Sequence, residues 1–240
     1  MKFKDKVVIV TGVSSDGQIG QAIAQAFAKE GAKLVISARR AEKVAARAEE
    51  IKAMGGDVLA VPADLTNEAE VNALVQKTLE QYGRVDILVN LAGGLTKFNA
   101  ITETSLADWT SELNNNLLTA FLCSKAVFGP MKDAGGGRII NFARAGEPQG
   151  KMVAYNCAKA GVWALTRTLA LEGRKANIKV NAIGPGLMDT KSNVKAMQPK
   201  EEDLARWPTR EELTSAVLFL ASDEASGISG QLLPVSGQLI

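Results

Sequence analysis

Short, nearly continuous apolar runs alternate with longer stretches of helical spacing along the whole chain. The runs are rich in β-branched residues, which is typical of strands buried on both faces of a parallel sheet. Seven such runs predict seven strands, at residues 7–10, 34–37, 58–61, 85–90, 138–142, 178–183 and 232–235.

The segments between these runs predict helices. The first three end at Gly31, Gly55 and Gly83, where a left-handed C-cap is expected. Strands that alternate with helices imply right-handed crossovers and a doubly wound sheet. The pattern therefore predicts an α/β fold, in which residues 1–240 form a single Rossmann domain with a seven-stranded parallel sheet flanked by helices. The helices are expected at residues 18–30, 41–54, 67–82, about 105–132, about 152–175 and about 209–222.

Composition and charge narrow the class of partner. A net charge of +2, with no block of like charges, gives no case for nucleic-acid binding. The apolar run at residues 7–10 is too short for a signal peptide or a membrane span. We therefore expect a cytoplasmic protein that binds neither nucleic acid nor membrane.

Histidine is absent, and cysteine occurs twice. The absence of histidine excludes Ser-His-Asp hydrolysis and His-ligated zinc, so no metal site is expected. Cys123 and Cys157 both fall among apolar residues of predicted helices. They are too few for a disulfide framework, and we expect both to be buried free thiols.

A glycine-rich turn joins the first predicted strand to the first predicted helix. Glycines at this point let the chain turn tightly and bring backbone amides against a pyrophosphate at the positive end of the helix. The turn therefore predicts a dinucleotide cofactor, held by Gly12, Ser14, Ser15, Gly17, Gln18, Ile19 and Gly20.

The end of the second predicted strand bears on the choice between NADP and NAD. A carboxylate there would bind the adenosine ribose and favour NAD, but the chain has Arg39 and Arg40. Two arginines favour the 2′-phosphate of NADP. NAD stays the alternative cofactor, in which case the two arginines are solvated surface residues.

Tyr155 and Lys159 lie four residues apart, on one face of a predicted helix. Lys159 can hold a positive charge near the Tyr155 hydroxyl and favour its ionised form. A free tyrosine has a pKa of about 10, so a useful acid near pH 7 requires roughly 4 kcal/mol of help from its surroundings. The alternative is an ordinary pair on a helix surface.

Together these features resemble the short-chain dehydrogenase/reductase family, and the resemblance covers essentially the whole chain. Further family marks occur in the expected order: Asp64-Leu65, Asn90-Leu91-Ala92-Gly93, Trp109 with Asn116-Leu117, the segment 181–186 with Thr190, and Gly230-Gln231 through Ser236-Gly237.

The resemblance implies a reaction and roles for the matching residues. Tyr155 would protonate a carbonyl oxygen during hydride transfer, Lys159 would bind the nicotinamide ribose, and Asn116 would hold a water that links Lys159 to solvent. It implies interconversion of a ketone, such as a 3-oxoacyl thioester, and a secondary alcohol. It also implies a homodimer or homotetramer. Further cofactor contacts are implied for Asp64, Leu65, Asn90, Ala92, Gly93, Pro185, Gly186, Met188 and Thr190.

The family's catalytic serine is missing. No serine or threonine occurs between Phe142 and Tyr155, and this segment is about two residues short. Loss of such a donor typically costs roughly 10²–10³ in rate. Either Arg144 points into the pocket and supplies donors to an anionic or polar substrate, or it faces solvent and the enzyme is slow or takes an unusual substrate. The second interpretation is favoured, because an unpaired cation beside a nicotinamidium is costly.

The glycine turn also departs from the family, with two extra residues between Gly12 and Gly20. This length resembles the enoyl-acyl-carrier-protein reductases, which place tyrosine seven residues before the lysine; here that position is Met152. Three functions therefore remain open: ketone reduction, which the tyrosine spacing favours, enoyl thioester reduction, and a weakly catalytic dinucleotide-binding sensor or partner subunit. Residues 187–208, irregular and polar, are either a substrate flap or a solvated connection.

Overall fold

Seven parallel strands form one sheet, in the order β3-β2-β1-β4-β5-β6-β7, in the computed structural model, which describes residues 1–238. The predicted α/β fold with a seven-stranded parallel sheet is confirmed. Strand order reverses between β1 and β4, and ligands of such sheets bind at this switch, beyond the carboxyl ends of the strands. The strands are β1 Val7–Thr11, β2 Lys33–Ser37, β3 Asp57–Ala60, β4 Ile87–Asn90, β5 Gly137–Phe142, β6 Ile178–Pro185 and β7 Leu232–Val235.

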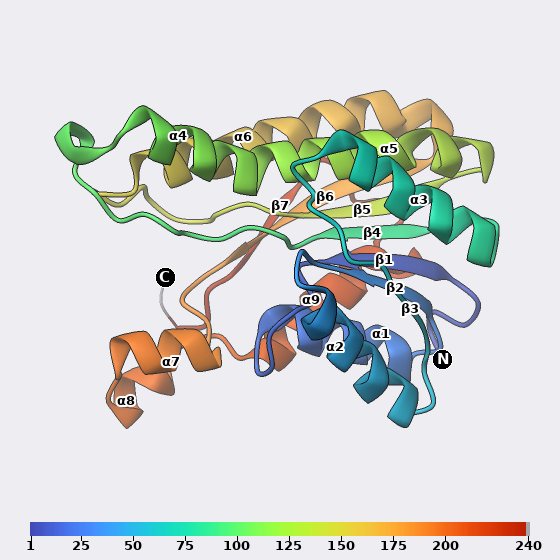
Figure 1. Cartoon of the computed structure of the whole chain (residues 1–240), viewed down its shortest axis with the longest axis horizontal. Helices are drawn as coiled ribbons and strands as arrows, with labels where there is room; N and C mark the ends of the chain where they lie inside the picture. Colours follow the sequence, from blue (N-terminus) through green and yellow to red (C-terminus); the bar gives the residue numbers. More distant parts are fainter. Residues whose placement is uncertain (239–240) are drawn as a thin grey trace.

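Helices cover both faces of the sheet (Figure 1). Successive residues of a strand point to opposite faces, so Val8 and Val10 enter one apolar cluster while Ile9 enters the other. The first cluster packs against α1 (Ile19–Lys29), α2 (Ala41–Ala53) and α9 (Arg210–Ala221). The other face is covered by α3 (Glu68–Tyr82), α4 (Leu106–Leu113), α5 (Thr119–Asp133) and α6 (Val153–Glu172). Single 3-10 turns occur at Ile101–Glu103, Gly173–Ala176 and Asp223–Ala225.

The predicted glycine C-caps are confirmed, since Gly31, Gly55 and Gly83 have φ of 82°, 80° and 78°. The helix predicted at residues 105–132 is interrupted: the segment η2, Asn114–Leu118, is a π-helix between α4 and α5. Single π turns inside helices are frequent at functional sites. Sequence periodicity does not show such a turn, because it changes the phase of the helix by only one residue.

Residues 187–208 contain more regular structure than predicted. They include α7 (Lys191–Met197) and α8 (Glu201–Leu204), which lie beyond the carboxyl ends of the strands (Figure 1). The Thr190 side chain caps α7 by accepting a hydrogen bond from the amide of Asn193 at 3.2 Å. This cap and the short helical turns were not evident from a polar, charged stretch.

The two cysteines have different surroundings. Cys123 is buried on α5, and burial raises the pKa of its thiol to about 12. Cys157 is exposed on α6, so the prediction that both thiols are buried is wrong for this one. Within residues 1–238 no helix is long and apolar enough to span a membrane, and no three metal-ligating side chains come together.

Candidate functional site

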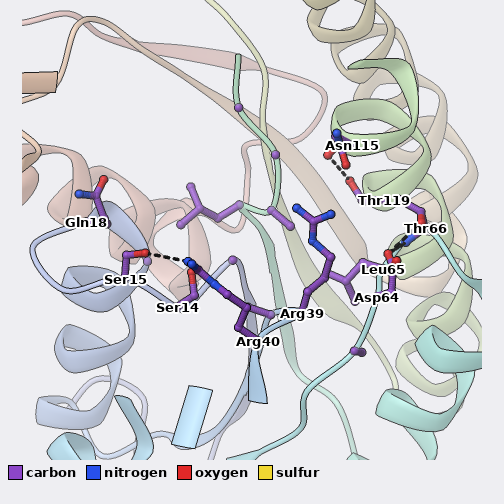
Figure 2. A pocket seen from close by; sticks show the side chains of 18 of the residues that line it. Ser14, Ser15, Gln18, Arg39, Arg40, Asp64, Leu65, Thr66, Asn115 and Thr119 are labelled. Carbon is purple, nitrogen blue, oxygen red and sulfur yellow. Dashed lines mark hydrogen bonds between the residues drawn. The ribbon is translucent and has the colours of Figure 1, made fainter. Parts of the chain in front are cut away.

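A pocket of about 710 Å³ opens at the carboxyl ends of the strands around the β1/β4 switch (Figure 2). Its volume lies within the range typical of cofactor sites. Twelve of the predicted cofactor residues line it: Gly12, Ser14, Ser15, Gln18, Ile19, Gly20, Arg39, Arg40, Asp64, Leu65, Ala92 and Gly93. The wall also includes Leu91, Gly94, Leu95, Thr96, Thr66, Asn115 and Thr119, which sequence reasoning did not assign to it.

The glycine turn brings the start of α1 against the end of β1. A Cβ atom at Gly20 would lie 2.6 Å from the carbonyl oxygen of Gly12, so only glycine fits. Within residues 1–238 no side chain caps α1 at Gln18, and its first turn carries no acidic residue. The first amides of the helix are therefore available to an anion, with the positive end of the helix dipole behind them. A cradle of this shape and charge fits a pyrophosphate.

Arg39 and Arg40 both point into this pocket (Figure 2). Arg40 donates a hydrogen bond from Nη2 to Ser15 Oγ at 3.3 Å. Asp64 accepts bonds from the amide and hydroxyl of Thr66, and these bonds, with a smaller contribution from the charge of Arg39, lower the pKa of Asp64. Two guanidinium groups thus lie at one end of the pocket, at the edge formed by β2 and β3.

Thr11 joins the two strands at the switch point. Its buried hydroxyl donates to the carbonyl of Val89 at 3.2 Å and accepts from the amides of Leu91 and Ala92, each at 3.1 Å. The hydroxyl therefore holds the loop after β4 beside the end of β1. In the sequence, Thr11 is recognisable only as part of a Thr-Gly pair, because the residues that its hydroxyl binds lie about 80 positions away.

Asn90 does not line the cofactor pocket as predicted. Its amide group donates to Ser124 Oγ at 3.0 Å and to Asn141 Oδ1 at 2.9 Å, toward α5 and β5. Asn141 in turn donates to Thr166 on α6 at 2.9 Å. This buried polar network joins β4 to β5 and to the helices over them.

Tyr155 and Lys159 lie on the first turns of α6, beside the end of β5. Lys159 Nζ donates to the carbonyl oxygen of Phe142 at 2.7 Å and lies 5.6 Å from the centre of the Tyr155 ring. Burial raises the pKa of Tyr155, and the charge of Arg144 lowers it in part. Lys159 and Arg144 thus both bring a positive charge near the phenol, and the predicted role of Lys159 stays a prediction.

Glu112 is the functional side chain that sequence reasoning missed. This carboxylate on α4 is 1% exposed and accepts hydrogen bonds from the amides of Thr96 and Lys97, at 2.6 and 2.9 Å, and from the Thr96 hydroxyl. The negative charge of Glu112 adds to the raised pKa of Tyr155. It also acts to raise the pKa of Lys159, against the larger lowering effect of burial. The available signal was its position, one helical turn before Asn116 and thus on the same face.

Asn116 is buried in the π-helix and uses its side chain to hold the loop after β4. It accepts from the Gly94 amide at 2.9 Å and donates to the Gly94 carbonyl at 3.1 Å and to Glu112 at 3.2 Å. A Cβ atom at Gly93 would lie 2.7 Å from its Oδ1, so this glycine is required by close contact. The side-chain amide of Asn116 is thus bound to protein, and the water predicted at Asn116 stays a prediction.

Arg144 follows β5 and is half-buried. Its Nη2 donates to the carbonyl of Glu147 at 3.1 Å, while its Nε is buried and has no hydrogen-bond partner among the described residues. Its charge reaches Tyr155. Arg144 is not among the residues that line the pocket at the β1/β4 switch, so both interpretations raised by the sequence stay predictions.

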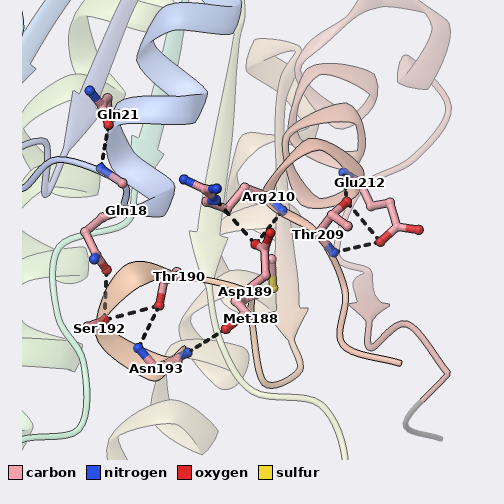
Figure 3. A network of polar contacts seen from close by, with 11 residues as sticks. Gln18, Gln21, Met188, Asp189, Thr190, Ser192, Asn193, Thr209, Arg210 and Glu212 are labelled. Atoms are coloured by element: carbon pink, nitrogen blue, oxygen red, sulfur yellow. Dashed lines mark hydrogen bonds and ion pairs between the residues drawn. The ribbon is translucent and has the colours of Figure 1, made fainter. Parts of the chain in front are cut away.

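The segment after β6 contacts the glycine turn (Figure 3). Lys191 forms an ion pair with Asp16, and its amide donates to the carbonyl of Gly17 at 3.3 Å. Ser192 Oγ donates to Gln18 Oε1 at 3.0 Å. Asp16, Gly17 and Gln18 of the long glycine turn therefore contact the segment 187–208. The predicted residues Gly17, Pro185, Gly186, Met188 and Thr190 lie at or near this contact and do not line the pocket.

Three comparisons place the chain among known proteins. A family model described as Enoyl-(Acyl carrier protein) reductase matches residues 12–237. The (2S)-[(R)-hydroxy(phenyl)methyl]succinyl-CoA dehydrogenase subunit BbsD of Thauera aromatica is 38% identical over 99% of this chain and 97% of its own. A 3-oxoacyl-[acyl-carrier-protein] reductase of Synechocystis sp. is 37% identical over 98% and 97%. A 7α-hydroxysteroid dehydrogenase, solved with NADH and 7-oxo glycochenodeoxycholic acid, superposes with a TM-score of 0.91 at 32% identity over 98% of this chain and 94% of its own.

Proposed function

The chain belongs to the short-chain dehydrogenase/reductase family, and from this premise we propose that it is an NADP-dependent oxidoreductase that interconverts a ketone and a secondary alcohol. One observation carries the proposal: the phenol of Tyr155 and the ammonium of Lys159 lie together at the end of β5, with the Phe142 carbonyl holding the lysine at 2.7 Å. A relative solved with NADH and a keto steroid supports both the cofactor class and the carbonyl chemistry.

The pocket residues would hold the cofactor along its length. Gly12, Gly20 and the start of α1 would bind the pyrophosphate, and Asp64 and Leu65 would contact the adenine. The guanidinium groups of Arg39 and Arg40 would bind a 2′-phosphate, which is the reason for proposing NADP over NAD. When bound, the nicotinamide supplies or accepts the hydride.

Tyr155 acts as the general acid in the reducing direction. Negative charge grows on the carbonyl oxygen as its carbon is reduced, and the phenol proton moves to that oxygen. Burial raises the pKa of Tyr155 and so keeps the proton in place at neutral pH, while the Arg144 charge offsets part of that effect. Lys159 is held where it can bind the nicotinamide ribose, and Asn116 positions Gly94 in the wall of the pocket.

A 3-oxoacyl thioester is the substrate class that the relatives favour. Two of them act on thioesters according to their names, a succinyl-CoA and a 3-oxoacyl carrier protein. The loop after β4 offers apolar surface at the pocket, with Leu95 on its wall and Phe98 59% exposed nearby. An acyl chain can pack against this surface.

Enoyl thioester reduction is a second candidate, and the description of the matching family model favours it. That chemistry places the tyrosine seven residues before the lysine, where this chain has Met152, buried and without a proton to donate. The spacing of Tyr155 and Lys159 therefore supports the ketone reaction over the enoyl reaction.

We also propose that the chain assembles as a homodimer or homotetramer through α5 and α6. These neighbouring helices expose large apolar side chains to solvent, with Phe121 of α5 43% exposed and Leu171 of α6 61% exposed. Size-exclusion chromatography with light scattering tests this proposal, and a monomer at all concentrations would contradict it.

The test of function is oxidation of NADPH in the presence of ketones, 3-oxoacyl thioesters and enoyl thioesters. We expect turnover of a ketone or 3-oxoacyl thioester, and its loss in Tyr155→Phe with NADPH still bound. If NADPH binds and nothing in the panel turns over, the reductase proposal is wrong and a binding or partner role takes its place. Turnover of enoyl thioesters alone would replace it with the second candidate.

A further inference from the structure

The backbone that carries Arg144 is fixed by its neighbours. The amide of Ala143 donates to the carbonyl of Ile183 at 2.9 Å, which extends the pairing of β5 with β6 beyond the last strand residue. A Cβ atom at Gly184 would lie 2.5 Å from the amide nitrogen of Ala145, so β6 passes directly against this backbone. The side chain of Arg144 therefore starts from a rigid point at the carboxyl end of the sheet.

The guanidinium group of Arg144 is not satisfied by the protein. Its single hydrogen bond within residues 1–238 goes from Nη2 to the neutral carbonyl of Glu147, and its buried Nε has no acceptor. No carboxylate of the described residues forms an ion pair with it. A guanidinium group that is partly removed from water in this way costs free energy unless an anion or acceptor meets it.

The charged groups near the Tyr155 phenol are also more positive than negative. Lys159 Nζ lies 5.6 Å from the centre of the Tyr155 ring, the positive charge of Arg144 lowers the pKa of Tyr155, and the buried carboxylate of Glu112 acts on both Tyr155 and Lys159. Both oxygens of Glu112 are already used, by the amides of Thr96 and Lys97 and by Asn116. These bonds hold Glu112 toward the loop after β4, and within residues 1–238 it forms no ion pair with Arg144.

We infer that Arg144 binds a carboxylate group of the substrate, so that the substrate, whether a free acid or a thioester, carries a carboxylate close to the reacting carbon. A planar guanidinium group presents its donors as a fork that matches a carboxylate, and such charge-assisted bonds are the strong ones. This inference rests on the proposed function, because it assigns the substrate class of the same site. It also gives a use to the residue that stands where the family has its serine.

The test measures binding without turnover. In complex with NADPH, hydroxy acids cannot react, so 3-hydroxybutanoate and 4-hydroxypentanoate are titrated by saturation-transfer NMR against their methyl esters. We expect the wild-type complex to bind at least one acid about tenfold or more tightly than its ester. Arg144→Ser is expected to reduce that preference to about twofold or less, and Arg144→Lys to retain part of it. Arg174→Ser, at an exposed arginine far from the site, should keep the full preference.

Further controls distinguish a loss of acid binding from misfolding and from a failure of the reductase proposal. Arg144→Gln keeps a longer polar side chain than serine without the positive charge, and serves if the serine variant does not bind NADPH. Equal binding of acid and ester by the wild-type complex overturns the inference. So does a preference for the acid that survives in both Arg144→Ser and Arg144→Gln. If ketones turn over without any preference for acids, the proposed function stands and this inference fails. If acids bind through Arg144 and no ketone turns over, the reductase proposal fails and the carboxylate site stands.

Discussion

The ammonium group of Lys159 donates a hydrogen bond to the backbone carbonyl of Phe142 at 2.7 Å, inside the protein at the end of β5. Burial lowers the pKa of Lys159 to about 8 from 10.5, although the negative charge of Glu112 opposes the shift. A lysine with this pKa changes its charge near physiological pH. The bond to Phe142 connects β5, after which Arg144 follows, to α6, the helix that carries Tyr155.

The first prediction concerns stability and pH. The folded protein binds the Lys159 proton less tightly than the unfolded chain, so the penalty for burying the charge is fully present below pH 8 and disappears between pH 8 and about 10.5. The free energy of unfolding of the protein without cofactor should therefore rise, relative to Lys159→Met, by up to about 3 kcal/mol across this window. Urea unfolding of both proteins from pH 7 to 10 measures the difference.

Comparison with the variant is essential for this measurement. The buried thiol of Cys123, whose pKa is raised to about 12 from 9.0, acts in the opposite direction, because the unfolded chain loses its proton above pH 9. Both proteins contain this thiol, so its effect cancels in the difference. A difference that does not change with pH would contradict the buried, titrating lysine.

The second prediction concerns Glu112→Gln. The negative charge of Glu112 raises the pKa of both Tyr155 and Lys159, so its removal should lower both and move the pH–rate profile toward lower pH. Glutamine keeps an acceptor for the amides of Thr96 and Lys97, which limits the structural change. Glu80→Gln, at an exposed position on α3, is the control and should leave the profile in place. An unshifted profile in the Glu112 variant would show that this carboxylate only holds the loop.

The third prediction concerns the choice of cofactor. If Arg39 and Arg40 bind a 2′-phosphate, replacing either by alanine should raise the Kd for NADPH about tenfold, since a charge-assisted bond contributes roughly 1.5–3 kcal/mol. The Kd for NADH should change by less than about twofold. Fluorescence titration with both cofactors gives the two values. Equal losses for NADPH and NADH would assign the arginines to a shared part of the cofactor.

The fourth prediction concerns the contact between Asp16 and Lys191. Both side chains are more than half exposed, at 57% and 65%, so the ion pair contributes little to the stability of the fold. It does, however, join the segment 187–208 to the glycine turn. We expect Asp16→Asn and Lys191→Met to leave the melting temperature within a few degrees of the wild type. The rate of NADPH dissociation, measured by stopped flow, should increase severalfold if the segment covers the cofactor as a flap, and an unchanged rate would contradict that role.

Local chemistry explains why so much of the fold was predictable. The β-branched runs, the helical spacing and the glycines at positions 31, 55 and 83 each specify a backbone state from a few neighbouring residues. The glycine turn also made most of the pocket predictable, because residues that follow successive parallel strands must meet at one edge of the sheet. Twelve predicted cofactor residues line the pocket for that reason.

Residue type and spacing did not predict the orientation of side chains that have several possible partners. Asn90 lies at the predicted strand end, yet its amide group binds Ser124 and Asn141. Cys157 shares its apolar neighbours with buried positions, yet it lies on the exposed side of α6. In each case the orientation depends on elements far away in the sequence.

By itself, the sequence determined the order of strands and helices, the family, the place of the dinucleotide pocket and the absence of the family's serine, since these follow from residue type and spacing. Only the tertiary structure decided that Glu112 is a buried carboxylate whose charge acts on Tyr155 and Lys159, and that the buried Nε of Arg144 has no hydrogen-bond partner within residues 1–238. Burial and electrostatic interaction depend on which segments pack together. Those properties set the pKa values of the site, and they arise from contacts between residues that are dozens of positions apart.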